Sequence, residues 1–372
     1  MAESDESVRQ RINLAVLVLV ALPAVVCVAA VRASCSCVVP SGGGGVFASP
    51  ASWLVASAGG SGSWWQDGRA MVKAMEVVIE QAAGYAQCTP VASHWMGLPL
   101  PAATCAVAGW HPLLLANVLF ALNVTAVFWL VGLVQGSFWL IDPYWSLIPP
   151  AFFALAALHP AGDPALAPGA PGWSRFVVCV ALVVVWALRL THSYFRREEW
   201  QIGAREDWRY VAMRERFGKA WPLLSLWYVF GVQHLLLVGI SLPIFAVVGS
   251  ADQAWTVMDT MATAAAVCGL LLAHVADNEL YEFVTTREMG EAPLLCTGTW
   301  RYSRHPNHFG EGLFWTALGG FALACGAGWM LVTVLVEERM MASPARSHLY
   351  KLYQKSTSRL IPWWKLAWHS QG

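Results

Sequence analysis

The stretch INLAVLVLVALPAVVCVAAV, residues 12–31, contains 20 consecutive residues without a charged side chain. At a rise of about 1.5 Å per residue, a helix of this length spans a hydrocarbon core of about 30 Å. Arg9 and Arg11 precede the run and Arg32 follows it. A cleaved signal peptide is the competing interpretation, because the letters VRA before Ser34 resemble a small-residue cleavage site. We favour a membrane anchor over a signal peptide.

The composition of the whole chain indicates the same class of protein. Of 372 residues, 57% are hydrophobic and only 12% are charged, and the mean hydropathy is +0.51. So few ionisable groups do not coat a water-soluble globule of this size. The formal net charge is zero and no basic tail stands out, so nothing indicates a nucleic-acid partner. The partner that the composition predicts is the lipid bilayer; protein partners are not indicated.

The chain divides into two parts by its pattern. Residues 1–110 hold the first apolar run and a linker rich in Gly, Ser and Ala, whereas residues 111–368 are expected to form the membrane domain. Further long apolar runs lie at about 112–134, 144–158, 174–192, 223–248, 254–276 and 309–336. With residues 12–31, these runs predict an all-α, polytopic helical membrane bundle of about seven transmembrane helices.

A basic segment between two runs predicts the orientation. Residues 195–219, FRREEWQIGAREDWRYVAMRERFGK, carry seven Lys and Arg, which the positive-inside rule places in the cytoplasm. Counting spans from there also places residues 277–305 on the cytoplasmic side. Within the basic segment, Glu206, Asp207, Arg209 and Tyr210 are expected on an amphipathic surface helix with internal salt bridges.

The second polar segment, RYSRHPNHFGEGLFW at residues 301–315, precedes and enters an apolar run. Pro306 suits the first turn of a helix, so a membrane helix is expected to begin near His305. Asn307 and Glu311 then share one face at a spacing of four, and His305 and His308 are three residues apart.

This helix start favours an anion. Free backbone N–H groups and the side chains of Arg301 and Arg304 would attract a phosphate group at the cytoplasmic mouth. Arginines lying in lipid headgroups are the alternative, but they do not account for Glu311, which is costly within an apolar run unless it faces a cavity or a partner. Because His305, His308 and Glu311 do not follow the H-E-x-x-H pattern, we predict no metal site.

A third polar segment, AHVADNELYEF at residues 273–283, ends the preceding run. Asp277, Glu279 and Glu282, with His274 and Tyr281, could hydrogen-bond the ribose or amide groups of a cofactor. A solvated helix end is the simpler alternative, and the residues alone leave both open.

Taken in order, these segments resemble a known family. The motifs DPYWSLIPP, WALRLTHSYFRREEW, REDWRY, VADNELYEF, WRYSRHPNHFGEGLFW and YQKSTSRLIPW are similar to those of the steroid 5α-reductase-like membrane proteins long labelled a domain of unknown function. The resemblance runs from about Asp142 to Trp364, and RHPN-x-FGE is its most specific part.

The resemblance implies a helical membrane bundle of at least seven helices whose cytoplasmic half binds NADPH. The steroid 5α-reductases carry A-N-F-L-G-E where this chain has residues 306–311, which supports a cofactor role for Asn307 and Glu311. Their C-terminal Tyr-x-Lys-Ser is echoed by Tyr353, Lys355 and Ser356. The cofactor-binding residues that we predict are Asp277, Arg301, Arg304, His305, Asn307, Glu311, Tyr350 and Tyr353.

The implied chemistry is hydride transfer from NADPH to the β-carbon of a conjugated enone, with an acid that polarises the carbonyl. Tyr194 and Tyr302 are the candidates for that catalytic acid. A steroid or other lipid enone arriving from the bilayer is the implied substrate, and the endoplasmic reticulum is the implied compartment.

The chain departs from the family at three places. His308 replaces a usual Tyr and Glu279 a common Gln, and both are tolerable polar exchanges. Between Phe309 and Val336 there are only 28 residues, interrupted by GAG at 326–328, whereas two spans need about 40. This segment is therefore expected to be either one long tilted helix or a helix with a short half-span, and the shortening predicts impaired activity.

Two other functions stay open. Membrane S-adenosylmethionine methyltransferases of the isoprenylcysteine and phospholipid type carry a similar R-H-P motif, a later Glu-Glu and a Tyr pair. These are echoed here by Arg304, His305, Pro306, Glu337, Glu338, Tyr350 and Tyr353. They usually place Tyr-x-Gly after the Pro, whereas Asn307 and the Gly310-Glu311 pair favour the reductase. A non-catalytic lipid-binding membrane protein is the third function.

Overall fold

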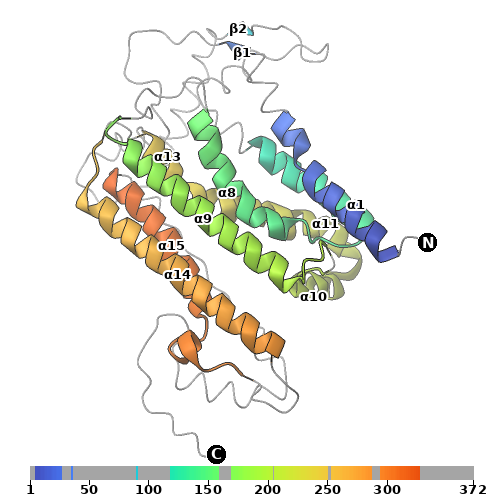
Figure 1. Ribbon diagram of the computed structural model, residues 1–372. Coiled ribbons are helices and arrows are strands. Elements are labelled where there is room, and N and C mark those ends of the chain that lie inside the picture. The colour runs from blue at the N-terminus through green and yellow to red at the C-terminus, as the bar shows by residue number, and fades with distance from the viewer. Residues whose placement is uncertain are drawn as a thin grey trace, which may run out of the picture. The chain divides into compact units, whose positions relative to one another are not determined.

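The computed structural model describes residues 5–26, 35–36, 89–90, 118–158, 169–203, 205–249, 253–286 and 294–326 (Figure 1). These residues are almost entirely helical. The exceptions in regular structure are two strands of two residues each, β1 (Cys35–Ser36) and β2 (Thr89–Pro90), which pair antiparallel with Cys35 opposite Pro90. The predicted all-α fold class is confirmed.

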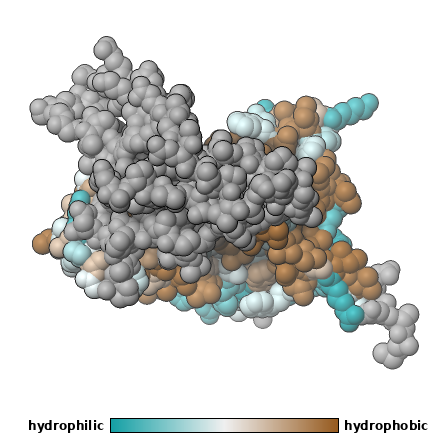
Figure 2. Space-filling model, turned by 90° about the horizontal axis from the view of Figure 1, so that it is seen from above, coloured by the Kyte–Doolittle hydropathy of each residue, from teal (hydrophilic) through white to brown (hydrophobic). Residues whose placement is uncertain are grey.

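Five helical segments of the described chain are long and apolar enough to cross a membrane. They are Glu6–Val26, Val118–Gln135, Trp173–Arg197, Trp208–Val248 and Val257–Thr286. Large hydrophobic side chains are exposed along them, among them Leu122, Leu188 and Leu271 at 59 to 66%. Figure 2 shows hydrophobic residues on the outer surface of the described part. Because water would oppose such exposure, the chain is an integral, polytopic membrane protein.

The chain forms two compact units. The first is Met1–Trp255 with Cys325–Met330, and the second is Thr256–Ala324 with Leu331–Gly372. The domain boundary that we predicted between residues 110 and 111 lies outside the described residues.

Unit 1 contains most of the helices. They are α1 (Asp5–Leu19), η2 (Asn123–Phe128), α7 (Trp129–Gln135), α8 (Ile141–Leu158), α9 (Trp173–Arg197), α10 (Trp208–Phe217), η4 (Gly218–Ala220), α11 (Trp221–Ser225), η5 (Leu226–Gly231), α12 (Val232–Ser241) and α13 (Pro243–Gly249). Helices α8 and α9 lie side by side (Figure 1). The predicted run at 223–248 is thus one helical region interrupted by the π-helix η5 and by a turn at Leu242.

The N-terminal helix is tied into unit 1 by polar side chains. Asn123 donates to the Val20 carbonyl oxygen at 3.0 Å, and Tyr144 donates to that of Leu17 at 2.6 Å. Asn13 donates to the Ile202 carbonyl oxygen at 2.7 Å. These three hydrogen bonds link the N-terminal helical segment to the rest of unit 1.

Unit 2 is built on two long helices, α14 (Val257–Thr286) and α15 (Pro306–Ala324), joined through η6 (Gly298–Arg301). The helices lie side by side (Figure 1). A Cβ added to Gly310 would lie 2.6 Å from the Gly269 carbonyl oxygen, and one added to Gly269 would lie 2.7 Å from that of Gly310. The two glycines therefore let the backbones approach as small residues do in membrane helix pairs.

Helix boundaries in unit 2 bear on two expectations. Helix α14 continues to Thr286, so the polar segment 273–283 lies in the last turns of a candidate span, as expected. Helix α15 begins at Pro306 as predicted but ends at Ala324, and Gly326 has a φ of +79°. A single long helix over 309–336 is therefore wrong, because the chain turns before the glycines at 326 and 328; residues from 327 on lie outside the description.

Candidate functional site

Two of the predicted motifs meet where α14 approaches the start of α15. Asn307, in the first turn of α15, donates from Nδ2 to Oδ1 of Asp277 on α14 at 3.0 Å. The Asn307 side-chain oxygen accepts from the His308 backbone N–H at 2.9 Å. The amide is thus fixed at both ends, and one carboxylate oxygen of Asp277 is held at a defined place beside the helix start.

The turn that leads into this helix start is held by Glu279. Its carboxylate accepts from the Thr299 backbone N–H at 2.9 Å and from the Thr299 hydroxyl. The indole N–H of Trp300 donates to the Ala276 carbonyl oxygen at 3.0 Å, and both residues are buried. Glu279 therefore positions the segment that carries Arg301 to His305, a role that the sequence did not assign to it.

The predicted cofactor-binding residues of unit 2 lie on this segment and on the first turns of α15. Arg301 and Tyr302 are exposed, and the Arg301 guanidinium carbon lies 6.0 Å from the centre of the Tyr302 ring. Arg304, His305 and Glu311 are half-buried. The His305 and His308 rings lie 5.5 Å apart, as their spacing predicted.

The structure does not relate three predicted site residues to this helix start. Tyr194 lies on α9 and belongs to unit 1. Tyr350 and Tyr353 lie outside the described residues, as do Glu337 and Glu338 of the alternative function.

A second polar cluster, which sequence reasoning missed, gathers at helix ends in unit 1. Asp142 stands in the first turn of α8, Tyr194 and Glu198 at the end of α9, and Tyr210 in the first turn of α10. Tyr210 accepts from Gln233 Nε2 of α12 at 3.2 Å, and Gln233 Oε1 accepts from the Trp145 indole at 2.8 Å. We call the residues Asp142, Tyr194, Arg197, Glu198, Asp207, Arg209 and Tyr210 the Asp142 cluster.

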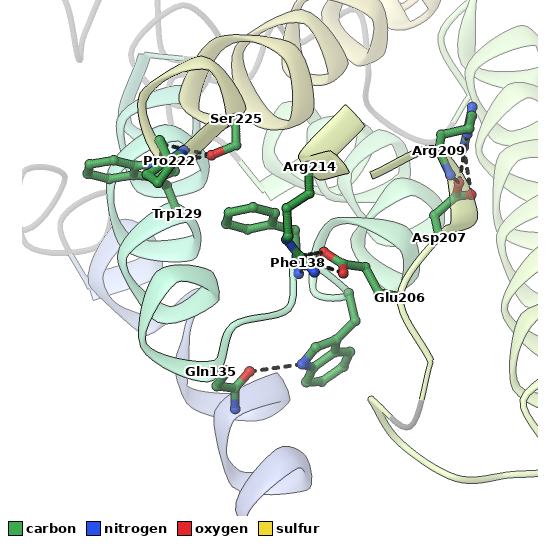
Figure 3. A network of polar contacts seen from close by, with 10 residues as sticks. Trp129, Gln135, Phe138, Glu206, Asp207, Arg209, Arg214, Pro222 and Ser225 are labelled. Atoms are coloured by element: carbon green, nitrogen blue, oxygen red, sulfur yellow. Dashed lines mark hydrogen bonds and ion pairs between the residues drawn. The ribbon is translucent and has the colours of Figure 1, made fainter. Parts of the chain in front are cut away.

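The start of α10 is anchored within unit 1. Arg214 donates to both carboxylate oxygens of Glu206 at 2.7 Å, and Glu206 also accepts from the Phe138 backbone N–H at 2.8 Å (Figure 3). Asp207 caps α10 and takes two bonds from the Arg209 guanidinium at 2.9 Å (Figure 3). The predicted internal salt bridges are confirmed, but Glu206 and Tyr210 are buried, so this helix is not simply a solvated surface helix.

The pKa values of the two aspartates in the Asp142 cluster are shifted in opposite directions. Burial raises the pKa of Asp142 to about 7, and the Asp207 charge adds to the rise against Arg209 and Arg197. Asp142 precedes the apolar run 144–158. Burial also opposes ionisation of Asp207, but the Arg209 hydrogen bonds outweigh it and hold the pKa of Asp207 below its usual range.

A family model described as "Protein of unknown function (DUF1295)" matches residues 128–357, which is more than half of the chain. The chain belongs to the DUF1295 family. An uncharacterised protein of Schizosaccharomyces pombe is 25% identical over 284 residues, which cover 67% of this chain and 77% of the yeast protein. No solved structure matches.

The DUF1295 region contains both polar clusters. It begins at Phe128, so it includes α8 to α10 with the Asp142 cluster and α14 to α15 with the Asp277–Asn307 pair. Groups of three or more His, Cys, Asp or Glu side chains that could hold a metal ion do not occur in the described part of the chain.

The pKa of Asp142 is raised and the pKa of Asp207 is lowered. Replacing each aspartate by asparagine should therefore change the stability of the protein in opposite directions. Protonation of Asp142 is favoured by folding, so its contribution to stability is present below its unfolded pKa of 3.8 and is lost as the pH rises through about 7. Asp142→Asn should therefore raise the melting temperature in detergent at pH 8 and flatten its fall between pH 5 and pH 8.

Asp207→Asn is the matched control. The pKa of Asp207 is lowered, so its contribution is present above its unfolded pKa of 3.8 and is lost as the pH falls below it. This variant should melt at a lower temperature than the parent at pH 8. If both variants melted at the same temperature as the parent throughout pH 5 to 8, the opposite pKa shifts of Asp142 and Asp207 would be contradicted.

Proposed function

We propose that this protein is an NADPH-dependent membrane reductase of a conjugated C=C bond in a steroid or other lipid enone. The observation that carries the proposal is the Asp277–Asn307 hydrogen bond, which joins the two motifs with the clearest resemblance to the steroid 5α-reductases. The endoplasmic reticulum, with the polar site facing the cytoplasm, is the compartment that fits this proposal and the basic segment 195–219.

The residues of unit 2 fit an anionic dinucleotide. Arg301 is exposed beside the start of α15, a helix of 19 residues, where phosphate groups are favoured by its guanidinium and by the helix dipole. The Asp277 carboxylate is an acceptor suited to ribose hydroxyl groups, and Asn307 keeps it in place. A positive charge suited to phosphate groups and a fixed acceptor suited to ribose hydroxyl groups are thus present at one helix start.

Bound NADPH would supply the hydride. The chain's own part is to hold the cofactor, to exclude water and to polarise the carbonyl oxygen as negative charge develops on it. Tyr302 belongs to the same unit as the cofactor residues and is 38% exposed, with the Arg301 guanidinium over its ring. Its phenolic O–H is a hydrogen-bond donor, so Tyr302 could polarise the carbonyl oxygen of a bound enone.

The methyltransferase remains the second candidate function. Its support is the Arg304-His305-Pro306 motif at the start of α15. Such methyltransferases usually have Tyr-x-Gly after the Pro, whereas this chain has Asn307 and the Gly310-Glu311 pair, so the reductase is preferred.

The proposal predicts that NADPH affinity depends on Asp277 and Asn307 as a pair. Asn307→Ala and Asp277→Ala should each lower NADPH affinity about tenfold, because each change removes a fixed hydrogen-bonding group. Since the two residues are in contact, the double variant should lose less than the sum of the single losses. Titration of detergent-purified protein, followed by NADPH fluorescence, measures all three.

Glu215→Gln is the control, because Glu215 is an exposed acid on α10 for which no cofactor contact is predicted. It should bind NADPH as the parent does. Equal affinity of the parent and of Asn307→Ala would remove the cofactor role from this helix start.

A further inference from the structure

The Asp142 cluster of unit 1 has unfilled hydrogen-bonding capacity. Tyr194 is only 7% exposed, and its hydroxyl, which is not fully buried, has no hydrogen bond to the residues that the structure describes. Glu198 is 9% exposed, and its Oε2 is buried without a partner within that same part of the chain. Buried polar groups without partners are costly, so their presence calls for a group that completes them.

The free groups include both donors and acceptors. Tyr194 offers an O–H donor and Glu198 Oε2 an acceptor, while the Tyr210 hydroxyl already accepts from Gln233 and retains its own proton to donate. No hydrogen bond from the described residues reaches the Asp142 carboxyl group, which lies within electrostatic range of both tyrosines. A ligand that only accepts, such as a ketone, would leave Glu198 unsatisfied.

The charges around Asp142 indicate a neutral ligand. The groups that act on it are Asp207 and Arg209 from α10 and Arg197 and Glu198 from the end of α9. Arg209 is paired with Asp207 through two bonds, and Arg197 lies 3.8 Å from Glu198. The charges of these two pairs balance when Asp142 is protonated, and burial raises the pKa of Asp142 to about 7, so its neutral form predominates below neutral pH.

The apolar part of the ligand is expected along α9. This helix ends at the cluster and is a candidate span, with Val184, Val185 and Leu188 exposed on it. In a bilayer these side chains contact lipid tails, so a chain or ring system lying among the tails would bring a polar end to the cluster.

We propose that the Asp142 cluster binds the hydroxyl group of a lipid alcohol, which donates to Glu198 and accepts from Tyr194 or from Asp142. The site lies in unit 1, and the proposal does not depend on the reductase function. A hydroxyl group is the smallest neutral ligand that both donates and accepts, and so satisfies both kinds of free group.

Photolabelling in phosphatidylcholine liposomes tests the site with three probes of equal length. These are a diazirine-bearing dodecan-1-ol, its methyl ether and the corresponding primary amine, and adducts are mapped by mass spectrometry to residues 139–158 and 187–203. The alcohol should label these segments about fivefold more than the ether, because the ether cannot donate to Glu198. Labelling by the alcohol should fall as the pH rises from 6 to 8, as Asp142 loses its proton.

Two pairs of variants support the assignment. Tyr194→Phe should lower labelling by the alcohol about fivefold, whereas Tyr228→Phe, at an exposed tyrosine of the same unit, should not change it. Asp142→Asn should keep labelling but remove its pH dependence, since an amide both donates and accepts at every pH. Asn307→Ala should label as the parent does, which separates this result from any failure of NADPH binding.

Two outcomes would overturn the proposal. Equal labelling by alcohol and ether would show that only the apolar tail is retained. Stronger labelling by the amine, rising with pH, would show a cation site in place of a hydroxyl site.

Discussion

Replacing Gly310 by alanine should separate α14 from α15 and destabilise unit 2 by about 3 kcal/mol. The added Cβ would lie 2.6 Å from both the Ala273 backbone nitrogen and the Gly269 carbonyl oxygen. Because these atoms belong to helix backbones, neither can move without shifting a whole helix. Amide exchange along residues 262–276 and 310–322, measured by mass spectrometry in detergent, should rise clearly.

Gly312→Ala is the control on the same helix. A Cβ at Gly312 meets no atom of the described residues within 4 Å, so this variant should keep the parent exchange rate or lower it through the better helix propensity of alanine. Parent-like exchange in Gly310→Ala would mean that the two helices are not packed as closely as the structure shows.

Replacing Gly298 by valine should disorganise the turn that carries Arg301 to His305. Gly298 has a φ of +56°, which a β-branched residue rarely adopts, and its Cβ would collide with the Glu279 carboxylate. The lost bonds from Thr299 to Glu279 are charge-assisted, so strain and lost bonding together should cost about 3 kcal/mol. Exchange at residues 298–305 should rise, and NADPH affinity should fall with it.

Gly218→Val is the control that introduces backbone strain without a steric collision. Gly218 has a φ of +50°, but a Cβ there meets no atom within 4 Å in the part of the chain that the structure describes, so only the strain of about 1 kcal/mol applies. If the two variants were equally destabilised, Glu279 would have no part in holding the turn at residue 298.

The helices and the start of α15 were predictable because their signals are local. Apolar runs of membrane-spanning length marked α9 and α14, and Pro306 marked a first helical turn. The pairing of His305 with His308 followed from helical spacing. The polar residues of 273–283 lie in the last turns of α14, in agreement with their expected place at the end of a span.

The remaining parts of the two sites depend on contacts between distant segments. Glu279 and Thr299 are 20 residues apart, and no local sequence pattern near either residue predicts the hydrogen bond between them. Asp142 precedes an apolar run and resembles an ordinary solvated helix start. Its neighbours come from helix ends 52 to 68 residues further along the chain, which only the packing of unit 1 brings together. A single carboxyl group at the mouth of an apolar run was the one signal in the sequence that could have drawn attention to it.

The most direct test of the cofactor assignment is a side-by-side titration of the parent protein, purified in detergent, with NADPH and with S-adenosylmethionine. The account predicts saturable binding of NADPH, and no competition when S-adenosylmethionine is added in excess. It also predicts that NADPH protects the backbone amides of residues 298–310 from exchange. Binding of S-adenosylmethionine alone, or of neither molecule, would contradict the claim that the Asp277–Asn307 helix start is a dinucleotide site.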